Sequence, residues 1–340
     1  MSIEKNEMQY APPTSPWVQR WLALIAAMIF AMVIVGGATR LTKSGLSITE
    51  WDPILGAIPP LNELDWQTAF AKYQQSSQYK LANQGMSIAD FHFIFWWEWA
   101  HRLLGRLLGV VFIVPFLFFA ITRRLPRYFW PKLAVLFAFG FLQGALGWYM
   151  VTSGLENRVE VSQYRLAAHL TTATALYAAV VWVVFTIDAK RKISSGANGW
   201  TALIIVALVF LQIAAGGFVA GLGAGQGYNT WPLMDGNIIP GGLSVMQPAW
   251  RNFFENALTV QFDHRMLAYL ITFIALWQLW RNNRASTRLF LSAIILQASL
   301  GIATLLLHVP LAIALIHQGG ALLVLTAAVW NLYNCQTASD

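Results

Sequence analysis

Eight apolar runs, each about as long as one membrane crossing, dominate this 340-residue chain. A helix needs about 20 predominantly apolar residues to cross the hydrocarbon core of a bilayer. The runs cover residues 17–37, 97–121, 130–151, 166–187, 200–220, 262–280, 289–307 and 311–332. They predict an all-α integral membrane protein with eight transmembrane helices. Only residues 308–310 separate the last two runs, so an odd number of helices is the alternative, although Pro310 suits the start of a new helix.

The composition fits a lipid environment and excludes the soluble classes of protein. Hydrophobic residues make up 57% of the chain and charged residues 11%, which is too little charge to cover a soluble protein of this size. The 22 Lys and Arg residues lie in short clusters between apolar runs, so we expect a lipid bilayer and no nucleic acid as the surroundings of the chain. Cys335 is the only cysteine. An intramolecular disulfide is therefore excluded, and histidine is the expected ligand for any metal.

The distribution of charge predicts the orientation of the chain in the membrane. Both termini and the connections after the second, fourth and sixth predicted helices contain 12 basic and 4 acidic residues, against 10 basic and 11 acidic on the other side. Because cytoplasmic segments carry an excess of Lys and Arg, we expect a multi-pass protein of the inner (plasma) membrane with both termini in the cytoplasm. Residues 1–16 form a cytoplasmic tail, without the pattern of a removable signal peptide.

The two halves of the chain resemble each other. Six positions match at an offset of 180 residues: Gly36, Gly37, Gly45, Trp51, Gly56 and Pro60 correspond to Gly216, Gly217, Gly225, Trp231, Gly236 and Pro240. Gln143 matches Gln297 at a smaller offset of 154, which indicates shorter connections in the second half. A repeat of four helices has even parity, so the halves are expected to be related by an axis along the membrane normal. We predict two pseudo-symmetric four-helix bundles, residues 17–190 and 191–340.

Four histidines occupy equivalent positions near the outer ends of the second, fourth, sixth and eighth predicted helices: His101, His169, His264 and His317. In an up-down-up-down bundle, alternate helices run in the same direction and face each other across the core. The histidines should therefore meet as two pairs, His101 with His169 and His264 with His317. Ionisable groups inside a membrane are expensive and usually functional, and imidazole is a common axial ligand of haem iron. Each pair is predicted to bind a haem.

Glu98 distinguishes the first histidine pair from the second. It lies three residues before His101 and so on the same face of the helix, whereas Gln261 holds the corresponding position before His264. An ionisable carboxylate beside only one iron suggests chemistry in the first half, and electron storage or structural support in the second. The alternative is that Glu98 simply pairs with Arg102, four residues on.

Three arginines lie within a turn of the histidines at the outer boundary: Arg102, Arg165 and Arg265. Guanidinium groups at this depth are candidates to pair with haem propionates, and snorkelling toward lipid headgroups is the alternative. The remaining histidines, His92 and His308, are predicted to lie in connections and not to bind iron.

Four motifs together resemble the heme A synthases of proteobacteria and mitochondria: EWAHRLLGR at 98–106, SQYRLAAHL at 162–170, TWPLMDG at 230–236 and QFDHR at 261–265. The resemblance covers nearly the whole chain. It implies oxidation of the C8 methyl group of haem O to a formyl group through a hydroxylated intermediate, which gives the haem A of terminal oxidases. One branch of the family has a cysteine pair in its outer loops. This chain lacks that pair, which excludes a mechanism in which those thiols pass electrons.

Carried over residue by residue, the resemblance implies that His101 and His169 hold the substrate haem O, with Glu98 beside it. His264 and His317 would hold a resident haem b. The resemblance also implies an association with haem O synthase, the enzyme that supplies haem O. The electron-transfer partner and the source of oxygen stay open, and a homo-oligomer is compatible with the sequence.

Two other functions account for parts of the pattern. A dihaem b-type membrane cytochrome that only carries electrons explains the four histidines, but not the difference between Glu98 and Gln261, and it predicts haems at different depths. A transporter built on repeats would need no paired axial ligands, and the sequence shows no broken helix at the middle of the membrane.

Overall fold

The computed structural model describes residues 15–52, 55–155, 158–187 and 197–337, and within these ranges it consists of helices and the loops between them. Seven of the described helices are long and apolar enough to cross a membrane. They are α2 (Pro16–Leu41), α5 (Ile88–Ile121), α6 (Trp130–Leu155), α7 (Gln163–Thr186), α8 (Ala197–Gly221), α12 (Ala285–Leu306) and α13 (Leu311–Thr337). The predicted all-α, multi-pass membrane protein is confirmed.

An eighth long helix, α11 (Ala257–Arg281), differs from these seven in composition. Its 25 residues are enough to span a bilayer. Gln261, Asp263, His264 and Arg265 nevertheless make its first half polar. The helix packs against α8 and α12. An eighth crossing therefore rests on length and packing rather than on apolar composition, and it stays a prediction.

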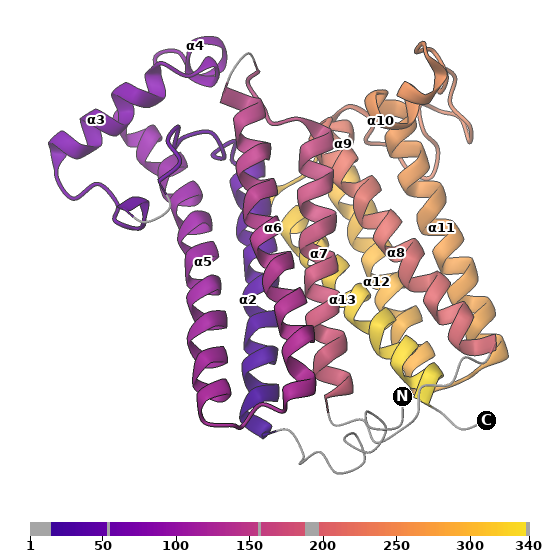
Figure 1. The fold of residues 1–340 in the computed structure, drawn as a ribbon. Helices are drawn as coiled ribbons and strands as arrows, with labels where there is room; N and C mark the ends of the chain where they lie inside the picture. Colours follow the sequence, from indigo (N-terminus) through magenta and orange to yellow (C-terminus); the bar gives the residue numbers. More distant parts are fainter. Residues whose placement is uncertain (1–14, 53–54, 156–157, 188–196, 338–340) are drawn as a thin grey trace.

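The long helices pack in an order that recurs in the two halves of the chain (Figure 1). In the first half α2 and α6 each contact α5 and α7, and in the second half α8 and α12 each contact α11 and α13. The halves meet where α7 packs on α8, where α13 packs on α2, and where α7 packs on α13. Helices α7 and α13, which carry His169 and His317, thus lie at the junction.

Short helices gather at one end of the long ones, called the loop end below (Figure 1). In the first half these are α3 (Glu63–Gln74) and α4 (Ser77–Ala82), and in the second half α9 (Ala224–Gly227) and α10 (Asn252–Glu255). Helix α2 begins and α13 ends at the opposite end. The described part of the chain also contains three single 3-10 turns: η1 (Leu55–Ala57), η2 (Arg127–Phe129) and η3 (Ala249–Arg251).

The main apolar core lies toward the opposite end of the bundle. It includes Trp21 near the start of α2, Phe119 near the end of α5 and Leu133 near the start of α6. Helices in a membrane associate through such close van der Waals packing. The four histidines lie in the other part of each helix, toward the loop end, where small and polar side chains replace the apolar core.

A second buried cluster joins α3 to the beginning of α5. Its members are Tyr73, Phe91, Ile94 and Phe95, all at most 6% exposed. The Tyr73 hydroxyl accepts a hydrogen bond from Asn83 at 2.7 Å, and burial raises the pKa of this phenol. The cluster holds α3 over the part of α5 that leads to Glu98 and His101.

Helix α5 corrects one expectation from the sequence. It begins at Ile88 rather than at residue 97, because the Ser87 side chain caps it by accepting from the Asp90 amide. His92 therefore lies in a helix, and the prediction of a connection is wrong; its ring lies 4.0 Å from that of Trp66 between centroids. His308 does lie in a connection, the turn between α12 and α13, with φ of 63°. Residues 1–14, 188–196 and 338–340 lie outside the described residues, and they contain some of the charged residues from which the orientation in the membrane is predicted.

Candidate active site

Each of the four histidines faces a glycine on a neighbouring helix. His101 on α5 packs against Gly36 of α2, and His264 on α11 packs in the same way against Gly216 of α8. A Cβ atom built on these glycines would lie 3.1 and 3.2 Å from the nearest imidazole atom. Such separations are shorter than ordinary van der Waals contact, so glycine leaves room that no other residue would leave.

The other two histidines repeat this arrangement. His169 on α7 faces Gly147 of α6, and His317 on α13 faces Gly301 of α12. A Cβ atom at these glycines would lie 3.0 and 2.9 Å from the nearest imidazole atom. In the sequence, Gly36 and Gly216 stand out only as matching positions of the repeat. The structure adds that each of the four glycines clears the space beside an imidazole.

Within each half the two histidines lie within electrostatic range of each other. The imidazoles of His101 and His169 are near enough to interact electrostatically, and so are those of His264 and His317. Among the described residues, His, Cys, Asp and Glu side chains form no group of three that could hold a metal ion by themselves. A pair of imidazoles instead suits an iron whose other four ligands come from a planar macrocycle. Binding of iron by these pairs stays a prediction.

Three of the histidines are also held by a glutamine. The side-chain nitrogens of three glutamines donate to histidine carbonyl oxygens, with N···O distances of 2.9, 3.1 and 2.7 Å: Gln143 to His169, Gln212 to His264, and Gln297 to His317. The first two amides also touch the ring, 3.0 and 3.1 Å from Nδ1. Sequence reasoning missed this role, because a glutamine on an apolar helix belongs to no motif until its neighbours are known.

Glu98 lies one turn before His101 and is 2% exposed. Its carboxylate accepts hydrogen bonds from the Ser47 hydroxyl and the Ile48 amide, both at 2.8 Å. It also accepts from Arg102, with Nε at 3.1 Å and Nη2 at 2.6 Å. A carboxylate buried this deeply needs such partners, because leaving water is otherwise costly. The ion pair that the spacing allows is therefore present, and it holds the carboxylate on the face of α5 that carries His101.

The corresponding place in the second half has no carboxylate. Gln261 donates to the backbone carbonyl oxygen of Tyr228 at 2.7 Å, and Arg265 Nη2 donates to the same oxygen at 3.3 Å. Tyr228 corresponds to Ile48 in the repeat, and Gly227 to Ser47. Glu98 and the hydroxyl that binds it are thus absent together from the second half.

The three arginines have different surroundings. Arg102 binds Glu98 and also donates to the carbonyl oxygens of Ile48 and Glu50, both at 2.7 Å. Arg165 donates to the carbonyl oxygen of Tyr149 at 2.6 Å, and its guanidinium lies 3.7 Å from the centroid of that ring. Arg265 keeps Nε and Nη1 buried without a hydrogen-bond partner. Of the three, Arg265 has most capacity left for an anionic group.

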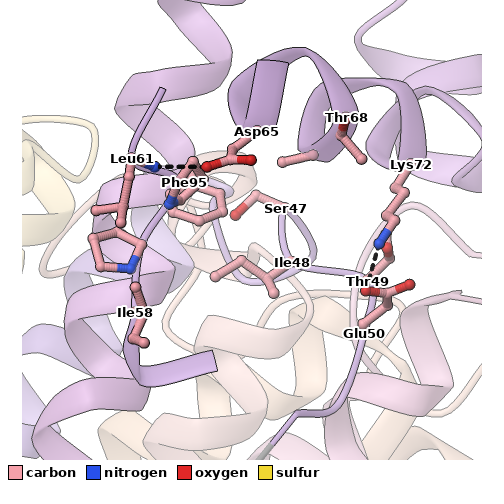
Figure 2. A pocket seen from close by; sticks show the side chains of 13 residues that line it. Ser47, Ile48, Thr49, Glu50, Ile58, Leu61, Asp65, Thr68, Lys72 and Phe95 are labelled. Atoms are coloured by element: carbon pink, nitrogen blue, oxygen red, sulfur yellow. Dashed lines mark hydrogen bonds and ion pairs between the residues drawn. The ribbon is translucent and has the colours of Figure 1, made fainter. Parts of the chain in front are cut away.

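A pocket of about 400 Å³ lies between α3 and the loop that binds Glu98 (Figure 2). Ser47 and Ile48, which donate to Glu98, line it. Lys72 of α3 lines it too and pairs with Glu50 at 2.8 Å, and both of these side chains are largely exposed, so the pocket reaches the surface. Only the Ser47 side chain and the Ile48 amide therefore separate the Glu98 carboxylate from a pocket of mixed polar and apolar lining at the loop end.

Comparison with known proteins identifies the family. A family model described as cytochrome oxidase assembly protein matches residues 19–329. The chain is 50% identical over 320 residues to the heme A synthase of Parvibaculum lavamentivorans, covering 92% of each chain. It is 52% identical to the heme A synthases of Mesorhizobium japonicum, over 92% of this chain and 90% of that one, and of Azorhizobium caulinodans, over 92% of each. The resemblance noted in the sequence is confirmed: the chain belongs to the cytochrome oxidase assembly protein family, together with these heme A synthases.

Proposed function

We propose that this protein is a heme A synthase, an oxidoreductase that converts the C8 methyl group of haem O to a formyl group through a hydroxylated intermediate. The observation that carries the proposal is the buried carboxylate of Glu98 on the histidine face of α5. The second histidine pair has Gln261 in its place. Relatives that share half of the sequence and are named heme A synthases support the same function.

The proposed architecture is eight transmembrane helices in two pseudo-symmetric four-helix bundles, residues 17–190 and 191–340. The recurring order of helix contacts supports it, since every contact between two long helices of the first bundle has a counterpart in the second. At the end opposite the loop end, Arg20 lies near the start of α2, and the connections from α5 to α6 and from α11 to α12 carry Arg124 and Arg284. By the excess of positive charge on the cytoplasmic side, this favours cytoplasmic termini in the inner membrane and histidines near the outer face.

The second histidine pair fits a resident haem b. Gly216 and Gly301 clear space beside the two imidazoles. Three buried polar atoms beside this pair have no partner among the described residues: Nδ1 of His317, and Nε and Nη1 of Arg265. His264 and His317 would hold the iron, and Arg265 would donate to a propionate. Haem b bound there would supply one-electron transfer.

In the first half, His101 and His169 would hold haem O as the substrate. Oxidation of a methyl group and water to a formyl group releases electrons and protons in equal number, so this site must move protons. Glu98 would take a proton near the reacting methyl group. Ser47 donates to Glu98 and lines the pocket of Figure 2, so its hydroxyl would connect the carboxylate to the surface. Haem O synthase is the proposed source of substrate, and a separate redox partner is the proposed electron acceptor.

The test is mass spectrometry of haem extracted after expression in a host that makes haem O but no haem A. Hydroxylated or formylated haem O, absent from the empty-vector control, is the expected result. An intact and reducible protein that yields only haem b would refute the proposal and favour a dihaem cytochrome that carries electrons.

A further inference from the structure

Three of the four histidines are each bound by a different glutamine side chain, and each of these glutamines has one polar atom without a hydrogen-bond partner. The amide nitrogens of Gln143, Gln212 and Gln297 bind histidine carbonyl oxygens, and their Oε1 atoms are buried without a partner among the described residues. When one imidazole nitrogen binds iron, the other carries a proton and needs an acceptor. An acceptor there orients the ring and strengthens the ligand. The amides of Gln143 and Gln212 lie against the rings of His169 and His264 and carry such an unpaired oxygen.

His101 has no such glutamine. The position that corresponds to Gln212 is occupied by Met32, one turn before Gly36, as Gln212 is one turn before Gly216. A thioether offers no N–H donor and only a weak acceptor. No hydrogen bond from a side chain of α2 to His101 takes the place of the contact that Gln212 makes with His264 in the second half.

A second difference accompanies the first. The terminal methyl of Met32 lies against Gly105, one turn after His101, and a Cβ atom built on Gly105 would lie 3.1 Å from it. The corresponding residue one turn after His264 is Ala268. The first half thus pairs a long apolar side chain with glycine, and the second half pairs glutamine with alanine. Because the size of the facing residue changes together with residue 32, we interpret Met32 as a side chain for which its surroundings are adapted.

We infer that His101 is the displaceable ligand of the first haem and that His169, held by Gln143, stays bound. Displacement of His101 would open one axial position to a small neutral reactant. The second haem, with both ligands held, would stay closed to such molecules. The inference deepens the proposed function, on which it rests for the identity of the substrate, but the difference in ligand strength belongs to the chain itself.

Carbon monoxide is the probe for an open axial position. Purified protein containing both haems is reduced and titrated with carbon monoxide, and the adduct is followed by its absorption difference spectrum while total haem is measured in parallel. The wild type should bind carbon monoxide at one of its two haems. Replacement of Met32 by Gln together with Gly105 by Ala, which recreates the second-half pair, should weaken this binding about tenfold or more, the usual scale for ligand-supporting groups. The same change one turn away, Met28→Gln, should not.

The reciprocal variant distinguishes a change in ligand strength from misfolding, because it should gain carbon monoxide binding rather than lose it. Gln212→Met with Ala268→Gly should open the second haem and add carbon monoxide binding without removing haem. Identical titrations of the wild type and both double variants, at full haem content, would overturn the inference, as would carbon monoxide binding at both haems of the wild type. If no haem A is formed but carbon monoxide binding follows Met32 and Gln212 as described, the proposed function fails and the inference stands.

Discussion

The two halves of the molecule share the glycines and arginines that surround their histidines, called the shared frame below. They differ in other side chains close to these histidines. Both halves have a glycine opposite each imidazole and an arginine that binds the same loop carbonyl position. The differences between them include Glu98, Ser47 and Met32 in the first half, where the second has Gln261, Gly227 and Gln212. In the roles proposed above, the shared positions provide room and iron ligands, whereas these three differences concern proton transfer and the strength of one ligand. We therefore expect the differences between two similar halves to mark the half in which the proposed chemistry takes place.

Removing a ligand from the second half should give the largest effect. In His264→Ala or His317→Ala, the resident haem b loses one of two axial bonds in an apolar site, so its absorption spectrum should disappear from the purified protein. His101→Ala and His169→Ala should instead lower retention of haem O and spare haem b. Haem content by extraction and mass spectrometry separates the two cases. Equal loss of both haems from all four variants would break the comparison, because it would indicate one shared site or a misfolded chain.

The next effect concerns the carboxylate that only the first half possesses. Glu98→Gln makes this position identical to Gln261 and removes the proton acceptor, so formation of haem A should fall by about 10²–10⁴-fold, the usual contribution of a positioned acid or base. Haem b should stay at its normal level. Glu63→Gln, on the exposed face of α3, is the matched control. Normal product formation in Glu98→Gln would remove the main support for placing the chemistry in the first half.

The glycines test whether the shared frame serves each half separately. Gly36→Ala places a Cβ atom 3.1 Å from His101, and Gly216→Ala places one 3.2 Å from His264. Such overpacking costs about 1–3 kcal/mol, which corresponds to about a five- to hundredfold weaker affinity. Each variant should lose haem from its own half only, as judged by haem content. Gly140→Ala on α6, where a Cβ atom would meet nothing within 4 Å, is the control.

The sequence predicts those features that depend on length, polarity and periodic position. Apolar runs locate the long helices, and the repeat offset brings out the four histidines with Glu98. Contacts that depend on the rotation of one helix against another are not predictable in this way, and the glutamines are the clearest example. Gln143 is visible as a repeat match, but its bond to His169 requires the packing of α6 on α7 to be known.

The errors at helix ends have a related cause. Helix α5 extends past the apolar run because the Ser87 cap and the aromatic cluster around Phe91 stabilise turns that lie under α3 rather than in lipid. Hydropathy does not reveal that α3 packs over the beginning of α5. In α11 the reverse holds: the face that carries His264 makes the helix too polar for a composition test, although its length and packing match those of its neighbours. Polar residues that the proposed site requires thus lower the hydropathy by which a membrane-spanning helix is predicted.

The smallest effect sharpens the role of Glu98. Ser47→Ala removes one hydrogen bond to a carboxylate that keeps its bonds from Ile48 and Arg102, so Glu98 should stay in place and haem content should not change. Formation of haem A should slow about fivefold, as expected for the loss of ~1 kcal/mol, because the carboxylate loses its hydroxyl link to the pocket. Ser47→Thr, which keeps the hydroxyl, should restore the rate. An unchanged rate in Ser47→Ala would exclude this path, and equal slowing in Ser47→Thr would mean that side-chain size rather than the hydroxyl is what matters at this position.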